Sequence, residues 1–215
     1  MAKRGLEQLF DWKRKVAGRK CAFPGCPEVA YKYTRYCCRH YHQDRVRGEA
    51  GCGPPAGKQH YGKWLKKVVP NLLALNANHE ALVKARAELS AIIIEASSGR
   101  RTIPAWSILS CIPLADIDKV FELWLALTFL YLVDKSPSIP SPRVLAFDYL
   151  RIVSVNWCRG TNGFGRLPAA SRRDGAALLF RTFYPPMSAL VEAWEKANAT
   201  GLVDYKAELE VPLEA

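Results

Sequence analysis

Four residues whose side chains bind metal ions lie close together near the start of the chain: Cys21, Cys26, Cys37 and His40. They form two pairs, the first around Pro24-Gly25 and the second only three residues apart. Structural zinc takes four tetrahedral thiolate or imidazole ligands, usually as two such pairs. At the start of a helix, residues three apart share one face, so the second pair can reach one ion. The spacing therefore predicts a structural zinc site.

Two further residues compete for this role, because Cys38 and His42 also share one helical face and either can replace a chosen ligand. The other interpretation is a set of reduced cysteines that binds nothing. Five of the seven cysteines lie between Cys21 and Cys52, in a chain without an apolar secretory segment, which favours metal binding over disulfides. A finger with so few aliphatic residues also needs a metal for stability.

The net positive charge of the chain is confined to the same region. Residues 1–69 carry 16 Lys/Arg and 5 Asp/Glu, whereas residues 70–215 carry 15 of each. Cations bind phosphates and release counterions, so this segment predicts contact with nucleic acid, most of all duplex DNA. The alternative is a solvated charged surface. The predicted nucleic-acid-binding residues are Lys13, Arg14, Arg19, Lys20, Lys32, Arg35, Arg39, Arg45 and Arg47.

Aromatic residues alternate with these cations at Tyr31, Tyr33, Tyr36 and Tyr41. Aromatic rings stack on bases, but a very small finger also needs them as core. A second basic patch follows in the other half of the chain, and either extends the footprint or pairs with the acidic tail. Its members are Arg151, Arg159, Arg166, Arg172, Arg173 and Arg181.

Three parts of this region form a recognisable order: the run Cys21-Ala-Phe-Pro-Gly-Cys26, the run Tyr36-Cys-Cys-Arg-His-Tyr41 and the basic stretch that ends at Gly48. Together they resemble a known group of short zinc fingers. These fingers occur in phage and mobile-element proteins and are often attached to HNH homing endonucleases. The resemblance covers about residues 21–48. It implies a structural zinc and DNA contact without catalysis, and a role as regulator or accessory factor of a phage or mobile element. Cys38 and Tyr31-Lys32-Tyr33 depart from the pattern.

A second class of function is a metal-dependent HNH-like nuclease. His60, Asn71 and His79 occur in the order of such a site, in which one His is the general base and the others hold a divalent metal. Against it, the Asn-to-His step is one residue short and His79 lies on a helical seam. A third class is an assembly adaptor whose basic face binds RNA or an acidic protein.

The periodicity of apolar residues predicts a mainly α fold, a small N-terminal zinc-binding finger followed by an α-helical domain. An amphipathic helix is expected over 4–17, a short one from Cys37 to Arg47, and a central buried one over Ala115–Val133. The Pro185-Pro186 pair is expected to end one helix before the last begins at Met187. The predicted divisions are a basic helix plus finger (1–50), a basic linker and short helix (51–69), a helical domain (70–200) and an acidic tail (201–215).

A heptad-like seam runs from Leu72 to Ile93, apolar except at His79 and Arg86. An arginine is accommodated more easily at the edge of an interface than in a core, because its charged end can remain in water. The seam therefore predicts a homodimer or a partner docked on this helix. The alternative is an intramolecular seam with Arg86 at its solvent edge. The longest apolar run, Leu123–Val133, is too short to cross a bilayer. No membrane partner is expected, and the predicted location is cytoplasmic.

Overall fold

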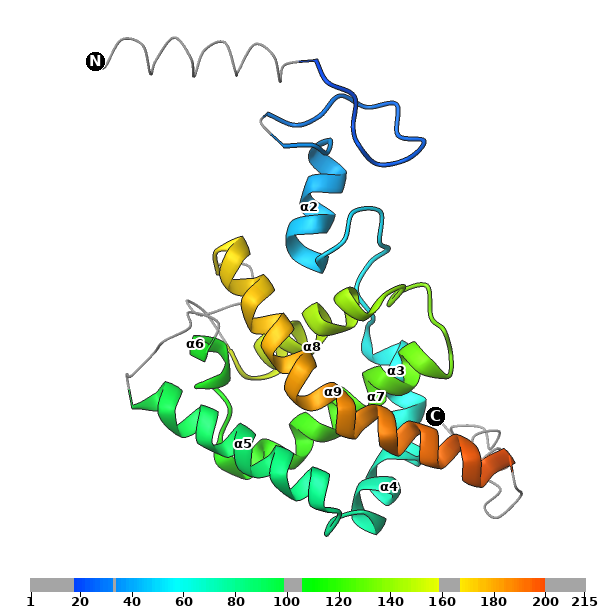
Figure 1. Ribbon diagram of the computed structural model, residues 1–215, viewed down its shortest axis with the longest axis vertical. Helices are drawn as coiled ribbons and strands as arrows, with labels where there is room; N and C mark the ends of the chain where they lie inside the picture. The colour runs from blue at the N-terminus through cyan, green and yellow to red at the C-terminus, as the bar shows by residue number, and fades with distance from the viewer. Residues whose placement is uncertain (1–17, 33, 99–105, 159–166, 200–215) are drawn as a thin grey trace. The chain divides into compact units, whose positions relative to one another are not determined.

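The structure is a computed structural model that describes residues 18–32, 34–98, 106–158 and 167–199 (Figure 1). The chain divides into two compact units, Met1–Gly53 and Pro54–Ala215. Within the described ranges all regular secondary structure is helical, apart from an isolated bridge between Lys20 and Val29. The predicted fold class is confirmed: the protein is mainly α, with a small Cys/His finger in front of a helical domain. The predicted helix over 4–17 and the tail 201–215 lie outside the described residues.

The N-terminal unit consists of irregular turns followed by one helix, α2 (Cys38–Arg47). Cys37 precedes the helix in an extended conformation and serves as its N-cap. Gly48 ends it with φ of 81°, a left-handed conformation that glycine adopts without steric cost, and donates its N–H to the Asp44 carbonyl at 3.0 Å. The helix predicted from Cys37 to Arg47 is thus confirmed.

The C-terminal unit is built from helices that pack around α7 (Ile117–Leu132). Most of α7 is buried on all sides, including Phe121, Trp124 and Phe129 at 0% exposure, as its nearly uniform apolar sequence predicts. None of the helices in the described ranges is long and apolar enough to cross a membrane. The others are α3 (Lys58–Lys67), α4 (Val69–Leu75), α5 (Glu80–Ser97), α6 (Trp106–Leu109), the 3-10 turn η1 (Leu114–Asp116), α8 (Pro142–Trp157) and α9 (Ala169–Ala199).

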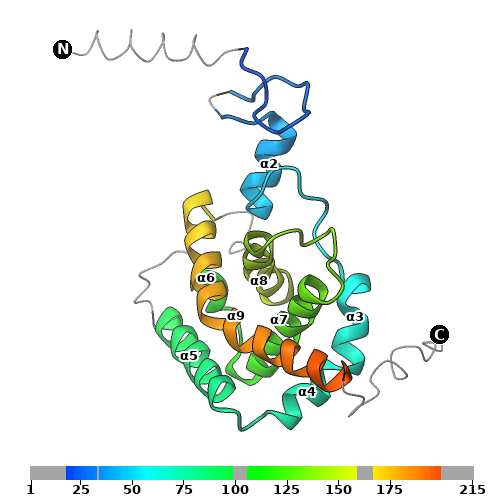
Figure 2. The same ribbon diagram turned by 45° about the vertical axis from the view of Figure 1, so that its right-hand side comes forward.

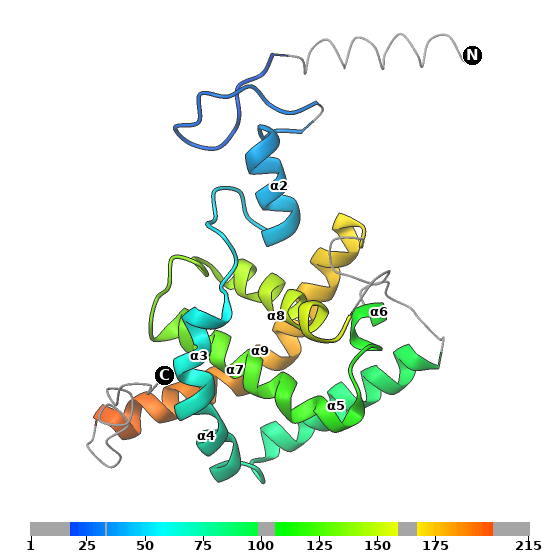
Figure 3. The same cartoon turned by 180° about the vertical axis from the view of Figure 1, so that it is seen from behind.

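Helix α3 lies beside α7 (Figure 3), and an aromatic and ionic cluster attaches the two helices to each other. The Trp64 ring stacks on Phe129 with centroids 4.5 Å apart, and its Nε1 donates to Asp134 at 2.9 Å. Lys63 donates to the other oxygen of Asp134 at 2.8 Å. Because this carboxylate binds both partners, the start of the helical unit is fixed to the end of its central helix.

The heptad-like seam is not one continuous helix. It is interrupted between α4 and α5, where His79 becomes the N-cap of α5 by accepting the Ala81 N–H at 3.3 Å. Within α5 the seam faces the core of the same chain, since Leu82 and Leu89 are 0% exposed. Arg86 lies at the edge, where it donates to Asp118 at 2.8 Å.

The prediction that Pro185-Pro186 separates two helices is wrong, because α9 continues through both prolines. Each proline removes one helical N–H and costs about 3 kcal/mol in a helix interior. Burial compensates for this loss, since Phe183 and Met187 on either side of the pair are 0% exposed and Trp194 is 5% exposed. The helix bends along its length, as prolines require (Figure 2).

Candidate metal centre and basic surface

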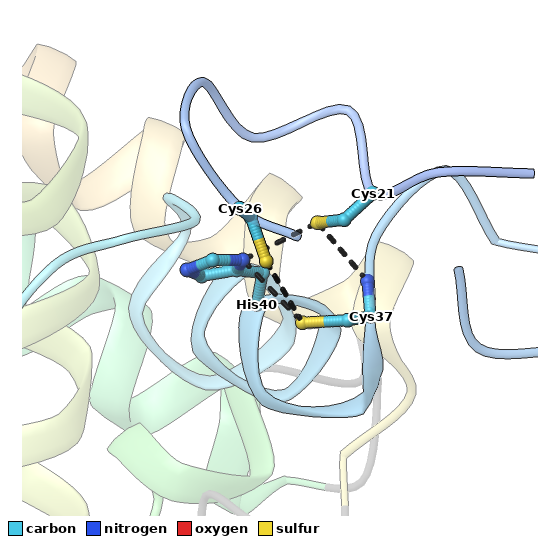
Figure 4. A group of neighbouring side chains, drawn as sticks. All are labelled: Cys21, Cys26, Cys37 and His40. Carbon is cyan, nitrogen blue, oxygen red and sulfur yellow. Dashed lines mark hydrogen bonds between the residues drawn. The ribbon is translucent and has the colours of Figure 1, made fainter. Parts of the chain in front are cut away.

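The first ligand pair lies on a tight turn that the sequence encodes directly. The Cys26 N–H donates to the Phe23 carbonyl at 3.1 Å, and Gly25 has φ of 74°. Proline followed by a left-handed glycine is the signature of a type II turn. The Cys21 N–H donates to the Glu28 carbonyl at 2.8 Å and closes the loop. The turn therefore brings the sulfurs of Cys21 and Cys26 to the same side (Figure 4).

The second pair lies at the start of α2, with Cys37 as N-cap and His40 in the first turn. The His40 Nδ1 atom is 3.3 Å from the sulfur of Cys21 and 3.4 Å from that of Cys37. The sulfurs of Cys26 and Cys37 are 3.9 Å apart. All four ligand atoms lie within 4.8 Å of one another, so the predicted ligands are brought together (Figure 4).

Three of these separations are close to the edges of a coordination tetrahedron. With bonds of ~2.3 Å to sulfur and ~2.0 Å to nitrogen, the ideal sulfur–sulfur edge is ~3.8 Å and the sulfur–nitrogen edge ~3.5 Å. The observed 3.9 Å and 3.3–3.4 Å lie close to both values. The group could therefore hold a metal ion once its widest separation, which reaches up to 4.8 Å, shortens around the ion.

The competing ligands lie elsewhere. Cys38 and His42 are exposed, and neither belongs to the group of four. Cys52 is buried but donates its thiol proton to the Glu49 carbonyl at 2.9 Å. No other group of three or more His, Cys, Asp or Glu side chains in the described ranges is arranged to hold a metal.

The electrostatic environment favours the thiolate form of Cys21. Burial raises the pKa of Cys21, but hydrogen bonds from the backbone of Cys37 and Phe23 and from His40 outweigh it and lower this pKa to about 6. The Cys37 amide donates to the Cys21 sulfur at 3.2 Å. At Cys26 a backbone hydrogen bond at Glu28 lowers the pKa, but burial and the neighbouring sulfurs raise it overall. Since a metal ligand must be deprotonated, binding of a metal would release a proton from Cys26 more readily than from Cys21, whose lowered pKa already favours the thiolate.

A shell of residues that the sequence did not reveal supports the ligands. The Phe23 ring packs on His40 with centroids 4.1 Å apart. Gly51 lies against that ring with φ of 84°, and a Cβ atom there would be 2.2 Å from the Phe23 ring. Gln43 accepts the Gly51 N–H at 2.8 Å and donates to the Cys52 carbonyl at 2.9 Å. The turn at 51–52 thus fixes the orientation of the imidazole.

Helix α2 has two distinct faces. His40 and Arg47 are buried, while Cys38, Arg39, His42 and Arg45 are exposed. Further exposed cations precede the helix, and together they form the finger's basic surface, defined as Arg19, Lys20, Lys32, Arg35, Arg39 and Arg45.

Arg47 was predicted as part of this surface, and the structure corrects that prediction. Its side chain is 3% exposed, and Nη1 donates to the Gly53 carbonyl at 3.2 Å, so it stabilises the end of the finger instead. The other two predicted residues of this surface, Lys13 and Arg14, lie outside the described ranges.

The tyrosine rings of the finger pack against other residues of the finger. The rings of Tyr31 and Tyr41 are 5.8 Å apart, and the Arg35 guanidinium lies 4.7 Å from the centre of the Tyr36 ring. All three are half-buried, whereas Tyr33 is not described. Among the described residues of this unit, no Phe or Tyr ring is left as an exposed stacking platform.

The second basic patch is smaller than the sequence indicates. Arg172 is 1% exposed, and Arg151 donates to Asp148 at 2.7 Å and to the Ala56 carbonyl at 3.1 Å. Arg173 and Arg181 are exposed, while Arg159 and Arg166 are not described.

The residues of the nuclease hypothesis have other local roles. The His60 Nδ1 atom accepts the Gly57 N–H at 2.9 Å at the start of α3. His79 caps α5, and Asn71 is exposed in α4. Both histidines therefore accept a backbone N–H at the start of a helix.

No protein-family model matches the chain, and comparisons with curated proteins and with solved structures find no match to it either.

Proposed function

We propose that this protein is a zinc-stabilised nucleic-acid-binding protein whose finger contacts duplex DNA through the basic surface. The observation that carries the proposal is the two-faced helix α2. Its first turn supplies one ligand pair, and its exposed face carries Arg39 and Arg45. A bound metal would fix this helix, so its cations would lose little conformational entropy on contact with phosphates.

The chemistry of the donors supports zinc as the metal. Three thiolates and one imidazole in tetrahedral arrangement are a common structural zinc set, and soft thiolates disfavour magnesium and calcium. All four positions come from Cys21, Cys26, Cys37 and His40, which leaves no open coordination site for a substrate. The ion would therefore serve the fold and not catalysis.

The small core of the finger supports the same conclusion. The buried apolar residues described in Met1–Gly53 are Cys21, Ala30, Cys37 and Cys52, and no large aliphatic side chain is among them. Such a unit buries too little surface to offset its conformational entropy. Metal binding would supply the missing folding free energy.

The state of the aromatic rings favours duplex over single-stranded nucleic acid. Proteins that bind single strands present exposed aromatic rings on which bases stack. Here the rings of Phe23, Tyr31, Tyr36 and Tyr41 all pack within the finger. A short basic helix with an exposed face is instead suited to a duplex groove and its flanking phosphates.

The motif Cys21–Cys26 with Cys37–His40 extends the proposal to a biological context, because it resembles fingers of phage and mobile-element proteins. We therefore propose a regulator or accessory factor of such an element. The adaptor hypothesis makes a different prediction, namely that RNA or an acidic protein competes with DNA for the basic surface.

Fluorescence anisotropy of the zinc-loaded full chain tests the proposal. Labelled duplex DNA, the same sequence as a single strand, and an RNA hairpin would be titrated over a range of KCl concentrations. If about five phosphates are neutralised, log affinity for the duplex falls with log salt at a slope of about −4 to −5. Equal or tighter binding to the RNA hairpin would favour the adaptor, and absence of binding to all three would overturn the proposal.

The chain offers a matched control for charge. Arg39→Ala should weaken duplex binding, whereas Arg181→Ala removes the same charge from an exposed position on α9 and should not. If both substitutions weaken binding equally, the contact lies outside the finger or depends only on net charge.

A further inference from the structure

Helix α5 has a second apolar stripe, which faces away from the core. It consists of Val83, Ala87, Ala91 and Ile94, all of them exposed, and we call it the outer stripe. Val83 is 50% and Ile94 57% exposed, which places both among the few large hydrophobic side chains open to solvent in the described ranges. The helix lies at the outer edge of the helical unit in all three views (Figures 1, 2 and 3).

The outer stripe is distinct from the seam that the sequence analysis singled out. The seam positions Leu82, Leu89 and Ile93 are buried within the same chain, on the opposite side of α5. At 100° per residue, the four positions of the outer stripe fall within one narrow sector of the helix. A stripe of this kind gains free energy when another apolar surface covers it.

We infer that the outer stripe binds a second copy of this chain, with the two α5 helices antiparallel. Antiparallel pairing about a two-fold axis near Glu88 places Val83 opposite Ile94 of the other copy and Ala87 opposite Ala91. A large residue then meets a large one at both ends, and small residues meet at the centre. Alanines at the crossing allow the axes to approach to about 8 Å, the close limit for packed helices.

Charge complementarity favours a second copy of this chain over a different partner on the outer stripe. It also favours antiparallel over parallel α5 helices. Lys84 and Glu95 border the same side of the outer stripe, and neither side chain forms an ion pair with another residue that the structure describes. In the antiparallel pair Lys84 of each copy lies beside Glu95 of the other, which forms two symmetric ion pairs. Parallel pairing would instead turn this flank of each copy toward the opposite flank of the other, which carries Arg86 and Ser90, so neither ion pair would form.

The contact is small, so the dimer should be weak. A standard stable interface buries about 800 Å² on each partner, more than one face of an 18-residue helix provides. We therefore expect dissociation constants on the order of tens of micromolar. This inference goes beyond the proposed function, because association is measured without nucleic acid and succeeds or fails independently of DNA binding.

Sedimentation equilibrium of the zinc-loaded full chain tests the inference, at protein concentrations from about 5 to 300 µM, chosen to bracket that affinity. The wild type should fit a monomer–dimer equilibrium. Lys84→Glu and Glu95→Lys should each weaken dimerisation about tenfold or more, because each replaces two attractive pairs with two repulsive ones. The double variant Lys84→Glu/Glu95→Lys should restore wild-type association.

Glu192→Lys is the matched control, since it makes the same charge change at an exposed position of α9 and should leave association unchanged. Unchanged circular dichroism of all variants shows that the fold is retained. A wild type that remains monomeric at 300 µM overturns the inference. A dimer that survives both single substitutions, or that the double variant does not restore, places the interface on another surface and overturns it equally.

Discussion

The ring of Phe23 packs against the ring of the metal ligand His40, with centroids 4.1 Å apart and planes inclined by 35°. Phe23 comes from the loop between the first two ligands, and Gly51 comes from the turn after α2. Gly51 approaches Cε2 and Cζ of Phe23, the finger's only described phenylalanine, so closely that a side chain there would clash. The geometry of the fourth ligand is thus coupled to a residue outside the ligand motif.

Gly51→Ala should therefore weaken metal retention without touching a ligand. The added Cβ would lie 2.2 Å from Cε2 of Phe23, and φ of 84° is itself strained for alanine by about 1 kcal/mol or more. We expect faster transfer of zinc to a chromogenic chelator than from the wild type. Gly53→Ala is the control, because a Cβ there meets nothing within 4 Å. Equal rates for the two variants would show that the Phe23 contact does not hold His40.

Replacement of a ligand should have a larger effect. Cys26→Ser should abolish stoichiometric zinc in the purified protein and unfold the finger, because the unit has almost no core of its own. Cys38→Ser should keep one zinc per chain, since that exposed side chain lies outside the group of four. Elemental analysis measures both outcomes. Zinc retained in Cys26→Ser but lost in Cys38→Ser would show that the ligand set is different.

The four metal ligands could be predicted because their arrangement depends on residues that are close together in the sequence. Two pairs of ligands separated by a turn and by one helical step define their geometry within a few residues, and Pro24-Gly25 encodes the turn. The Phe23–Gly51 contact was not predictable, since it joins positions far apart in the sequence and glycine carries no periodic signal. Tertiary contacts of this kind emerge only when the chain is folded.

In the helical unit, too, some features follow from the local sequence, whereas others depend on tertiary contacts. The apolar run in α7 predicts a central helix whatever its neighbours. By contrast, local propensity places a helix end at Pro185, and burial of Phe183 and Met187 overrides it. Arg47 and Arg172 were misjudged for a related reason. Charge in a sequence indicates a surface, but it does not show which arginines have a buried partner.

Arg45 and Arg47 are close in sequence, and their substitutions should give opposite phenotypes. Arg45→Ala should retain zinc and reduce the salt slope of DNA binding by about 1, as loss of one phosphate contact requires. Arg47→Ala should instead speed zinc loss, because it removes the hydrogen bond to the Gly53 carbonyl and leaves a void at a position 3% exposed. Anisotropy and chelator assays on both variants test this. A reduced slope with normal zinc retention in Arg47→Ala would contradict the structural role.

Thiol labelling should separate the cysteines by environment. Burial, together with the neighbouring Cys111, raises the pKa of Cys158 to about 12. Since the thiolate is the nucleophile, a raised pKa means slow alkylation at neutral pH and a rate that still increases above pH 9. Cys38 is exposed and should react first in the zinc-loaded protein. Iodoacetamide pulses read by peptide mass spectrometry test this order, and equal labelling of Cys38 and Cys158 at pH 7 would contradict it.

The buried pair of Asp148 and Arg151 should dominate the polar contribution to the stability of the helical unit. The Asp148 side chain is 0% exposed, and Arg151 links it to the Ala56 carbonyl at the start of the same unit. Asp148→Ala leaves the guanidinium largely buried without its main counter-charge, which typically costs about 3 kcal/mol or more. Urea unfolding followed by tryptophan fluorescence measures this loss, because five of the six tryptophans lie in residues 54–215.

Asp118→Ala provides the comparison, since it breaks the ion pair with Arg86 at a carboxylate that is 72% exposed. Exposed pairs contribute about 0–1 kcal/mol, because water and salt screen the charges and the side chains lose entropy when paired. The two substitutions remove the same chemical group. A difference between their losses of unfolding free energy therefore reports the effect of burial and not of charge alone. Losses of equal size in both variants would mean that Arg151 regains hydration when Asp148 is removed, and that its link to Ala56 does not stabilise the unit.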